Sequence, residues 1–310
     1  MMRWGVFGGS SRIYQGSLRP AFEEIGHAVV DAPSRRGDDF APYDEMLARG
    51  DIDAVYNPLP NHLHAEWSHR ALDAGKHVLC EKPLTMSPGE STKLFDHAEA
   101  AGLTILEAYM WPHHPRAQAQ LTLVTDGALG TLQSGRASFS YPMDMSSGDH
   151  RIDTRGAGAL FDIGIYCIAP FMLIADRDPV GMAAGATRND LAVDVAMAGW
   201  VNWGGGFSSA FDVSFDAPLR KQIALSASDG LVTLPGSHVP GPDGPSEIII
   251  ERRDGSVDTI DCAGANAYAG MVSHFEAVTT GNAEPIFGRR ESLRLAEIFD
   301  QLHRQSGAAI

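Results

Sequence analysis

Over the first third of the chain, short apolar runs typical of β-strands alternate with longer helical stretches. The runs cover residues 4–7, 28–30, 53–56, 77–80 and 103–106. A helix is predicted over residues 87–101, with Ser87 as its N-cap and Gly102 as its stop signal. Such alternation requires parallel strands, because each helix carries the chain back across the sheet. We therefore predict an α/β Rossmann domain with a doubly wound parallel sheet over residues 1–112.

From about Pro115 the pattern changes, and strand-like segments follow one another across GGG, DAP and DG turn signals. These segments cover residues 130–141, 193–203, 207–215, 222–228, 231–234 and 247–252. Helices are predicted over residues 115–127, 158–175, 269–279 and 290–305. Because tight turns join antiparallel strands, residues 113–310 are expected to form an α+β domain with an open, mainly antiparallel sheet. We assign substrate binding and oligomerisation to this second domain.

The predicted open sheet is rich in large aromatic side chains. They are Trp200, Trp203, Phe207, Phe211 and Phe215. We expect them on an exposed face, and an apolar face of that size has to be covered by something. The sequence therefore predicts a homodimer or homotetramer assembled through this sheet.

The charge and hydropathy of the chain exclude several classes of partner. A formal net charge of −15 opposes binding to nucleic acid or to an anionic membrane. No apolar run reaches the roughly 18 residues that a membrane-spanning helix needs, and the first residues lack a signal-peptide pattern. We expect a cytoplasmic protein with neither nucleic-acid nor membrane partners.

Neither the cysteines nor the histidines are spaced as metal ligands. Cysteines occur only at Cys80, Cys167 and Cys262, without a CxxC pair, and are expected to be free thiols. The pairs His62/His64 and His113/His114 have no carboxylate or cysteine at ligand spacing. No metal site is predicted.

A glycine turn follows the first predicted strand and precedes a helix, which is where a pyrophosphate binds in a dinucleotide fold. Its spacing departs from GxGxxG. The candidate phosphate-binding residues are Gly8, Ser10, Ser11, Arg12 and Ile13.

The end of the second strand should contact the adenosine ribose. Ser34 and Arg35, followed by Arg36, suit the 2′-phosphate of NADP, which arginine grips with charge-assisted bonds. Asp31 is the competing candidate and would favour NAD. We favour NADP, with NAD as the alternative.

The stretch HVLCEKPLTM, residues 77–86, places a carboxylate and an amine at a strand's carboxyl end, where open α/β sheets bind ligands. A loop with an ordinary ion pair is the competing interpretation. Pro83 is expected to fix the turn that aims Lys82. Tyrosine, whose unperturbed pKa is about 10, becomes a better proton acceptor near an ammonium, which makes Tyr166 a candidate partner. Asp162 lies four residues before Tyr166 and would share its helix face.

Several segments together resemble the glucose–fructose oxidoreductase and inositol dehydrogenase (Gfo/Idh/MocA) family, nearest its dimeric dihydrodiol dehydrogenases and xylose dehydrogenases. The segments are NPLPNHLH (57–64), AGKHVLCEKP (74–83), EAYM (107–110), GALFDIGIYC (158–167) and the tail 267–302. The resemblance covers almost the whole chain in order. Two departures are the short connection between the second and third strands, residues 34–53, and WPHHP (111–115) where the family has an arginine.

The resemblance implies a hydride transfer between NADP(H) and a carbohydrate, polyol or trans-dihydrodiol CH–OH group. It implies that Lys82 and Tyr166 meet at the nicotinamide, with Asp162 contacting the substrate or Lys82. Further cofactor contacts are expected from Leu59, Pro60, Asn61, His64, Glu81 and Pro83. Substrate contacts are expected from Trp111, His113, Tyr141 and Arg151. The alternative from another class is a non-catalytic NAD(P)-sensing regulatory protein of the same fold.

Overall fold

A computed structural model describes residues 1–35, 37, 39–153, 158–236, 238, 241, 244 and 246–307. The chain divides into two compact units. The first comprises Met1–Met110 and Asn266–Ala296, and the second comprises Trp111–Ala265 and Glu297–Ile310. The predicted boundary near residue 112 treated each domain as one continuous segment. The structure instead counts Asn266–Ala296 with the first unit, because this segment packs on the start of the chain.

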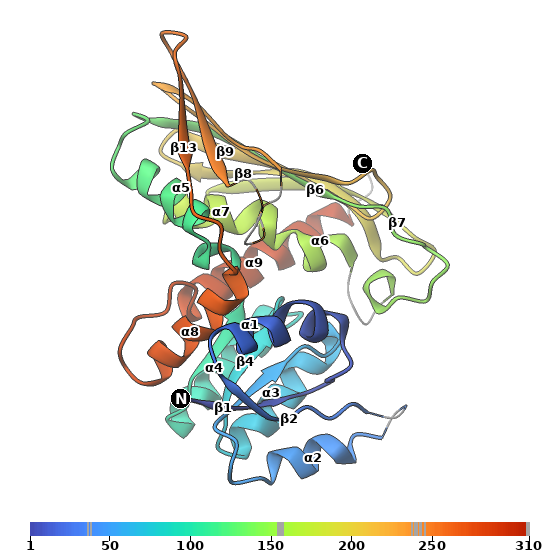
Figure 1. The fold of residues 1–310 in the computed structure, drawn as a ribbon. Coiled ribbons are helices and arrows are strands. Elements are labelled where there is room, and N and C mark those ends of the chain that lie inside the picture. Colours follow the sequence, from blue (N-terminus) through green and yellow to red (C-terminus); the bar gives the residue numbers. More distant parts are fainter. Residues whose placement is uncertain are drawn as a thin grey trace. The chain divides into compact units, whose positions relative to one another are not determined.

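The first unit is built on a five-stranded parallel sheet in the order β2-β1-β3-β4-β5 (Figure 1). Its strands are β1 Arg3–Val6, β2 Ala28–Asp31, β3 Ala54–Asn57, β4 His77–Glu81 and β5 Ile105–Ala108. Its helical segments are the π-helical turn Tyr14–Leu18, α1 Arg19–Glu24, α2 Ala41–Leu47, the 3₁₀ turn Asn61–Leu63, α3 His64–Asp73, α4 Pro88–Ala101 and α8 Ala267–Thr279. Helix α9, Arg289–Ser306, begins in this unit. The α/β fold class predicted from the alternation is confirmed.

The predicted start and stop of α4 are also confirmed. The Ser87 side chain accepts a hydrogen bond from the Glu90 N–H, and Gly102 adopts a left-handed conformation with φ of 66°. The short connection between β2 and β3, noted as a departure from the family, nevertheless contains helix α2. This helix buries Tyr43, Met46 and Leu47. The burial of these three apolar side chains accompanies a helix even in this short connection.

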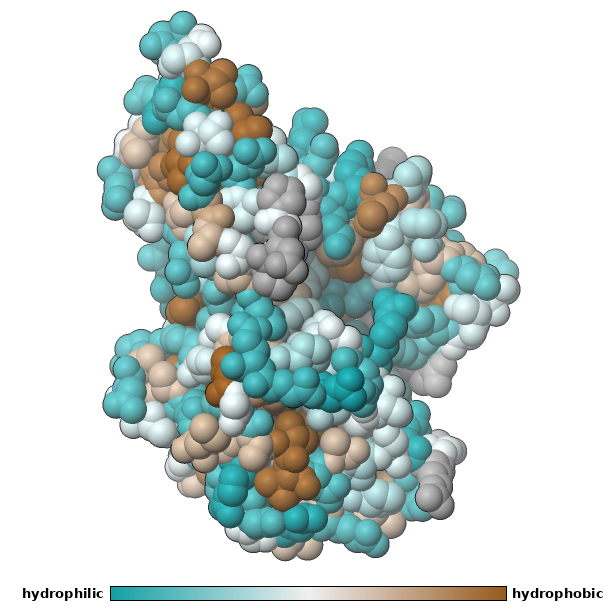
Figure 2. Space-filling model, in the orientation of Figure 1, coloured by the Kyte–Doolittle hydropathy of each residue, from teal (hydrophilic) through white to brown (hydrophobic). Residues whose placement is uncertain are grey.

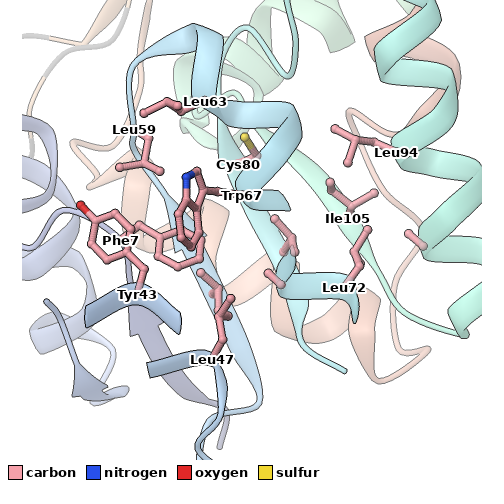
Figure 3. Packing of buried hydrophobic residues seen from close by; sticks show 14 of the residues in the cluster. Phe7, Tyr43, Leu47, Leu59, Leu63, Trp67, Leu72, Cys80, Leu94 and Ile105 are labelled. Carbon is pink, nitrogen blue, oxygen red and sulfur yellow. The ribbon is translucent and has the colours of Figure 1, made fainter. Parts of the chain in front are cut away.

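One face of the first sheet packs on a core that helices α2, α3 and α4 complete (Figure 3). Trp67 of α3 is at its centre, edge-on to Phe7 at 5.3 Å and to Tyr43 at 5.1 Å between ring centroids. Aromatic pairs in this arrangement add to the free energy gained from burying apolar area. The cluster fixes the loops that follow β1 and β3, since Leu59 and Leu63 belong to it.

The second unit is built on an eight-stranded mixed sheet in the order β13-β12-β11-β10-β6-β9-β8-β7. Its strands are β6 Leu132–Ser140, β7 Gly181–Arg188, β8 Asp194–Gly204, β9 Phe207–Ser214, β10 Arg220–Ala227, β11 Gly230–Leu234, β12 Glu247–Arg252 and β13 Val257–Asp261. Its helical segments are the 3₁₀ turn Trp111–His113, α5 Pro115–Thr125, the 3₁₀ turn His150–Ile152, α6 Gly158–Ile163, α7 Ile165–Ala175 and the end of α9. All pairs are antiparallel except β6 with β9. The predicted open, mainly antiparallel sheet is confirmed.

Two strands of this sheet escaped prediction. Strand β7 reads GMAAGATR, which has no aromatic residue and only one β-branched residue, Thr187, so the composition typical of strands is weak. Strand β13 is an exposed edge strand. Each forms a strand through backbone pairing with its neighbour, β7 with β8 and β13 with β12. The local sequence does not show this pairing.

Helices α6 and α7 pack on one face of the sheet, and the expectation for its aromatic residues was wrong in four cases of five (Figure 1). Trp203, Phe207, Phe211 and Phe215 are buried, whereas Trp200 is 46% exposed. Successive residues of a strand point to opposite faces, so Trp200 and Trp203 cannot share one. The aromatic face therefore lies under the chain's own helices, where Phe171 of α7 packs on Phe207.

In the view of Figure 2, hydrophilic residues predominate and the hydrophobic ones lie in separate groups. No helix among the described residues is both long and apolar enough to cross a bilayer.

Two glycines of the second sheet give a matched test of this packing. A Cβ on Gly135 of β6 would lie 2.5 Å from the Phe171 ring, whereas a Cβ on Gly185 of β7 would meet nothing within 4 Å. We expect Gly135→Ala to lower the free energy of unfolding by about 1–3 kcal/mol through overpacking. Gly185→Ala should change it by less than about 1 kcal/mol. Urea denaturation measures both, and equal effects would contradict the described packing.

Candidate active site

The loop after β4 leaves the sheet through Glu81, Lys82 and Pro83, and the Lys82–Pro83 peptide bond is cis. The Tyr56 hydroxyl, at the end of β3, donates a hydrogen bond of 2.7 Å to Glu81 Oε1. Burial, together with the charge of Glu81, raises the pKa of Tyr56 well above its usual value. Tyr56 is thus a permanently neutral donor that fixes the Glu81 carboxylate.

A second carboxyl group, that of Glu107 on β5, holds the same loop. The Leu84 N–H donates a hydrogen bond of 3.0 Å to Glu107 Oε1. Glu107 is 5% exposed, and burial raises its pKa to about 7. Glu107 belongs to the EAYM motif (107–110) but was not predicted as a site residue. A carboxylate in the otherwise apolar strand ILEA was the signal that could have identified it.

His64 joins the loops that follow β3 and β4. Its Nε2 lies 2.6 Å from the Leu59 carbonyl oxygen, and its Nδ1 lies 2.7 Å from the Pro83 carbonyl oxygen. Asn57, fully buried, donates to Ser68 and accepts from the Leu59 N–H. These contacts define the conformation of the 59–64 loop, which contains the predicted cofactor contacts Leu59, Pro60, Asn61 and His64.

The glycine turn is shaped by contact with the end of β2. A Cβ on Gly9 would lie 2.1 Å from the Ala32 carbonyl oxygen, and the Gly9 N–H already bonds to the Pro33 carbonyl at 3.0 Å. Gly8 has a left-handed φ of 63°. Helical structure starts at Arg12, and first-turn N–H groups have no intrahelical acceptor. The N–H groups of Arg12 and Ile13 are therefore the ones suited to a phosphate.

Ser34 and Arg35 lie directly after β2, beside this turn. The Ser34 Oγ accepts from the Ser10 N–H and donates to the Ser10 Oγ, both at 2.9 Å. The Arg35 guanidinium lies over the Phe40 ring, 5.3 Å from its centroid. Asp31, the competing candidate, forms an ion pair of 3.6 Å with Arg49. Arg36 lies outside the described residues.

The second unit brings together Tyr141, Arg151 and Asp162. Arg151 donates two hydrogen bonds to Asp149, through Nε at 2.9 Å and Nη2 at 2.6 Å, and a third to the Tyr141 hydroxyl at 2.8 Å. That hydroxyl in turn donates to Asp162 Oδ2 at 3.0 Å. The Arg151 hydrogen bonds hold the pKa of Asp149 well below its usual range. The cluster is fixed in one geometry, and Asp149 is a member that the sequence analysis missed.

Tyr166 is the second residue of α7 and is buried against Phe139 of β6, 5.4 Å away between ring centroids. His238 stacks on the same Phe139 ring and lies 6.1 Å from the Tyr166 ring. Burial lowers the pKa of His238 to about 4, so this imidazole is neutral at physiological pH. Asp162 and Tyr166 stand on either side of Gly164, which separates α6 from α7.

The remaining predicted residues lie in the 3₁₀ turn Trp111–His113, where Trp111 is fully buried and His113 half-buried. Among the described residues no cluster of histidine, cysteine and carboxylate side chains could hold a metal ion. The His114 side chain instead caps α5 by accepting from the Arg116 N–H. Cys80, Cys167 and Cys262 are free thiols.

The site residues thus form two groups. Lys82 and the cofactor candidates belong to the first unit, while Tyr166, Asp162, Tyr141 and Arg151 belong to the second. Each group is ordered by its own hydrogen bonds. The meeting of Lys82 with Tyr166 stays a prediction.

Two family models match the chain. Residues 18–109 match an oxidoreductase family with an NAD-binding Rossmann fold, and residues 118–233 match the GFO/IDH/MocA C-terminal domain. A D-xylose 1-dehydrogenase (NADP(+)) of Haloferax volcanii is 33% identical over 87% of this chain and 84% of its own. A dTDP-3,4-didehydro-2,6-dideoxy-α-D-glucose 3-reductase of Streptomyces violaceoruber is 36% identical over 84% and 74%. The crystal structure of KijD10, a 3-ketoreductase from Actinomadura kijaniata in complex with NADP and TDP-benzene, superposes with a TM-score of 0.87 at 30% identity, covering 98% of this chain and 97% of that one.

Proposed function

The chain belongs to the GFO/IDH/MocA family of NAD(P)-dependent oxidoreductases, and we propose that it interconverts an alcohol and a carbonyl group on a carbohydrate or related polyol, using NADP(H). The observation that carries the proposal is the loop after β4. Glu81 and Glu107 each hold this loop, and Lys82 lies between them in the chain at the carboxyl edge of the parallel sheet. Ligands of open α/β sheets bind at that edge.

The cofactor fits the residues of the first unit. The close approach at Gly9 leaves room for glycine alone, and the adjoining first-turn N–H groups suit a pyrophosphate. Ser34 and Arg35 are the proposed contacts of the adenosine 2′-phosphate. The pairing of Asp31 with Arg49 supports NADP over NAD, because a carboxylate engaged in an ion pair is less suited to bind ribose hydroxyls. When bound, the nicotinamide supplies or accepts the hydride.

The chain's own residues handle the proton and orient the substrate. We assign the proton transfer to the Tyr166 hydroxyl, whose pKa a nearby Lys82 ammonium would lower. The Tyr141–Arg151–Asp162 cluster offers fixed polar groups for sugar hydroxyls. The D-xylose and dTDP-sugar relatives support a sugar as the substrate class, and a trans-dihydrodiol is the second class to test.

We also propose that the chain forms a homodimer or homotetramer through the face of the second sheet opposite α6 and α7. That face has a depression of about 440 Å³ lined mostly by small side chains, and the half-exposed Trp200 also lines it. The lining includes Ser134, Ser208, Ala210, Ala224 and Ser226. Small side chains allow a second sheet to approach closely, and burying Trp200 removes a large apolar group from water.

Arg35→Ala tests the cofactor assignment. We expect it to weaken NADPH binding about 10- to 100-fold, because charge-assisted bonds to a phosphate contribute about 1.5–3 kcal/mol, and to leave NADH binding unchanged. Fluorescence titration of both nucleotides measures this. Arg19→Ala, an exposed arginine of α1, is the control. Equal loss for both nucleotides would make Asp31 the better guide to the adenosine site.

Lys82→Met and Tyr166→Phe test the chemistry. We expect each to lower kcat at least about 100-fold, the usual contribution of general acid–base catalysis, across a panel of sugars, polyols and dihydrodiols. Tyr166→Phe should retain NADPH binding. Lys93→Met, at an exposed position of α4, should match the wild type. Wild-type NADPH binding without turnover of any panel member would instead support the non-catalytic, NAD(P)-sensing alternative.

Trp200→Glu tests the assembly. A buried charge in a sheet-to-sheet interface is unfavourable, so this variant should sediment as a smaller species than the wild type at micromolar concentration. Leu191→Glu, an exposed leucine between β7 and β8, is the control and should leave sedimentation unchanged. A wild-type protein that sediments as a monomer would refute the proposal.

A further inference from the structure

The loop that bears Lys82 is held from both faces of the parallel sheet. In the register of β4 with β5, Cys80 is opposite Glu107 and Glu81 is opposite Ala108. Since neighbouring residues of a strand point to opposite faces, Glu81 and Glu107 lie on different faces. Glu81 is fixed by Tyr56 on one face, and Glu107 binds the Leu84 N–H on the other.

Glu107 is costly to keep where it is. Its side chain is almost fully buried next to Cys80, in register with an apolar part of the sheet. A buried carboxylate is stable only with partners, and a glutamine would accept the Leu84 hydrogen bond without a charge. In the proposed function Glu107 only holds the loop through the Leu84 hydrogen bond, a task that requires no charge. Glutamine could replace Glu107 structurally at a lower cost of burial. The presence of an acid at this position therefore indicates that its charge has a role.

We propose that Glu107 is a positioning residue for Lys82: its carboxyl group fixes the turn after Pro83, and its charge controls the protonation of the Lys82 amine. This inference rests on the proposed function only for the task of Lys82. The electrostatic coupling itself is a property of the protein without substrate.

The charges around Glu107 make it a switch near neutral pH. Its pKa is raised to about 7, chiefly by burial, which the Ser292 side chain of α9 and the Leu84 N–H partly offset; the charge of Glu81 also raises this pKa and the ammonium of Lys82 lowers it. Burial keeps the Cys80 thiol and the Tyr56 phenol protonated by raising both pKa values well above their usual range. The charges that vary are therefore those of Glu107, Glu81 and Lys82. When Glu107 ionises, it stabilises the Lys82 ammonium and so raises the pKa of that amine.

The chain is suited to a direct measurement because it has few lysines. They are Lys76, Lys82, Lys93 and Lys221. We would label the protein with ¹³C-lysine, assign the Lys82 Cε resonance with Lys82→Arg, and follow its shift from pH 5 to 11. In the wild type we expect two inflections, one near pH 7 from Glu107 and one from the amine itself.

Glu107→Gln should remove the inflection near pH 7 and lower the amine pKa of Lys82. Glu45→Gln, an exposed glutamate of α2, is the control and should leave both inflections in place. A wild-type Lys82 signal without the inflection near pH 7 would overturn the proposal, and so would its persistence in Glu107→Gln.

A second readout uses stability and needs no labelling. The folded-state pKa of Glu107, about 7, lies above the ordinary value of 4.5 for a glutamate, so the folded chain binds more protons than the unfolded chain between these values. The free energy of unfolding then falls as the pH rises through this window. Glu107→Gln should be more stabilising at pH 8 than at pH 5. An effect that is the same at both pH values would count against the buried charge.

Both readouts are made without substrate or nucleotide. If Lys82 and Glu107 are coupled but no substrate is turned over, the proposed function fails and this inference stands. If turnover depends on Lys82 while its resonance is indifferent to Glu107, the inference fails and the proposed function stands.

Discussion

The imidazole of His64 joins the two loops on which the arrangement of the first unit's site depends. It contacts the carbonyl oxygens of Leu59 and Pro83, and so ties the loop after β3 to the loop after β4. Parallel strands deliver their loops to one edge of the sheet, but they do not fix the spacing between those loops. His64 sets that spacing. The hydrogen bonds of Glu107 and Tyr56 add to this contact, so the loop that bears Lys82 is held at three points. Such a loop suits a side chain that has to meet a cofactor in one geometry.

Two tyrosines of this chain show how environment decides the role of one side chain. Tyr56 is fully buried beside the carboxylate of Glu81, and both effects favour the neutral phenol. It can only donate a hydrogen bond. Tyr166 lies in the second unit, where its ring packs near Phe139 and His238. The proposed proton transfer requires the opposite electrostatic setting, which an ammonium would supply.

Much of the fold could be predicted because its signals are local. The alternation of strands and helices, the Ser87 cap and the Gly102 stop each depend on a few neighbouring residues, and all three are present in the structure. The five aromatic residues of the second sheet could not all be placed on one face. Trp200 and Trp203 are three residues apart on one strand, so their side chains point to opposite faces. Glu107 and Asp149 were missed for a related reason. Their significance lies in contacts with Leu84 and Arg151, and in the burial of Glu107, which only the folded chain defines.

The first unit is completed by a segment that comes late in the chain. Trp4 of β1 packs on Phe275 of α8, 5.3 Å away between ring centroids, and the Met2 N–H bonds to Glu276. During synthesis on the ribosome, the first five strands emerge long before α8 does. Until then one side of Trp4 has no partner from α8, so the nascent domain carries an exposed apolar surface until residues 266–296 have been synthesised. This order of events makes the N-terminal domain a candidate client for chaperones that bind nascent chains, and it ties its final folding to the arrival of residues 266–296.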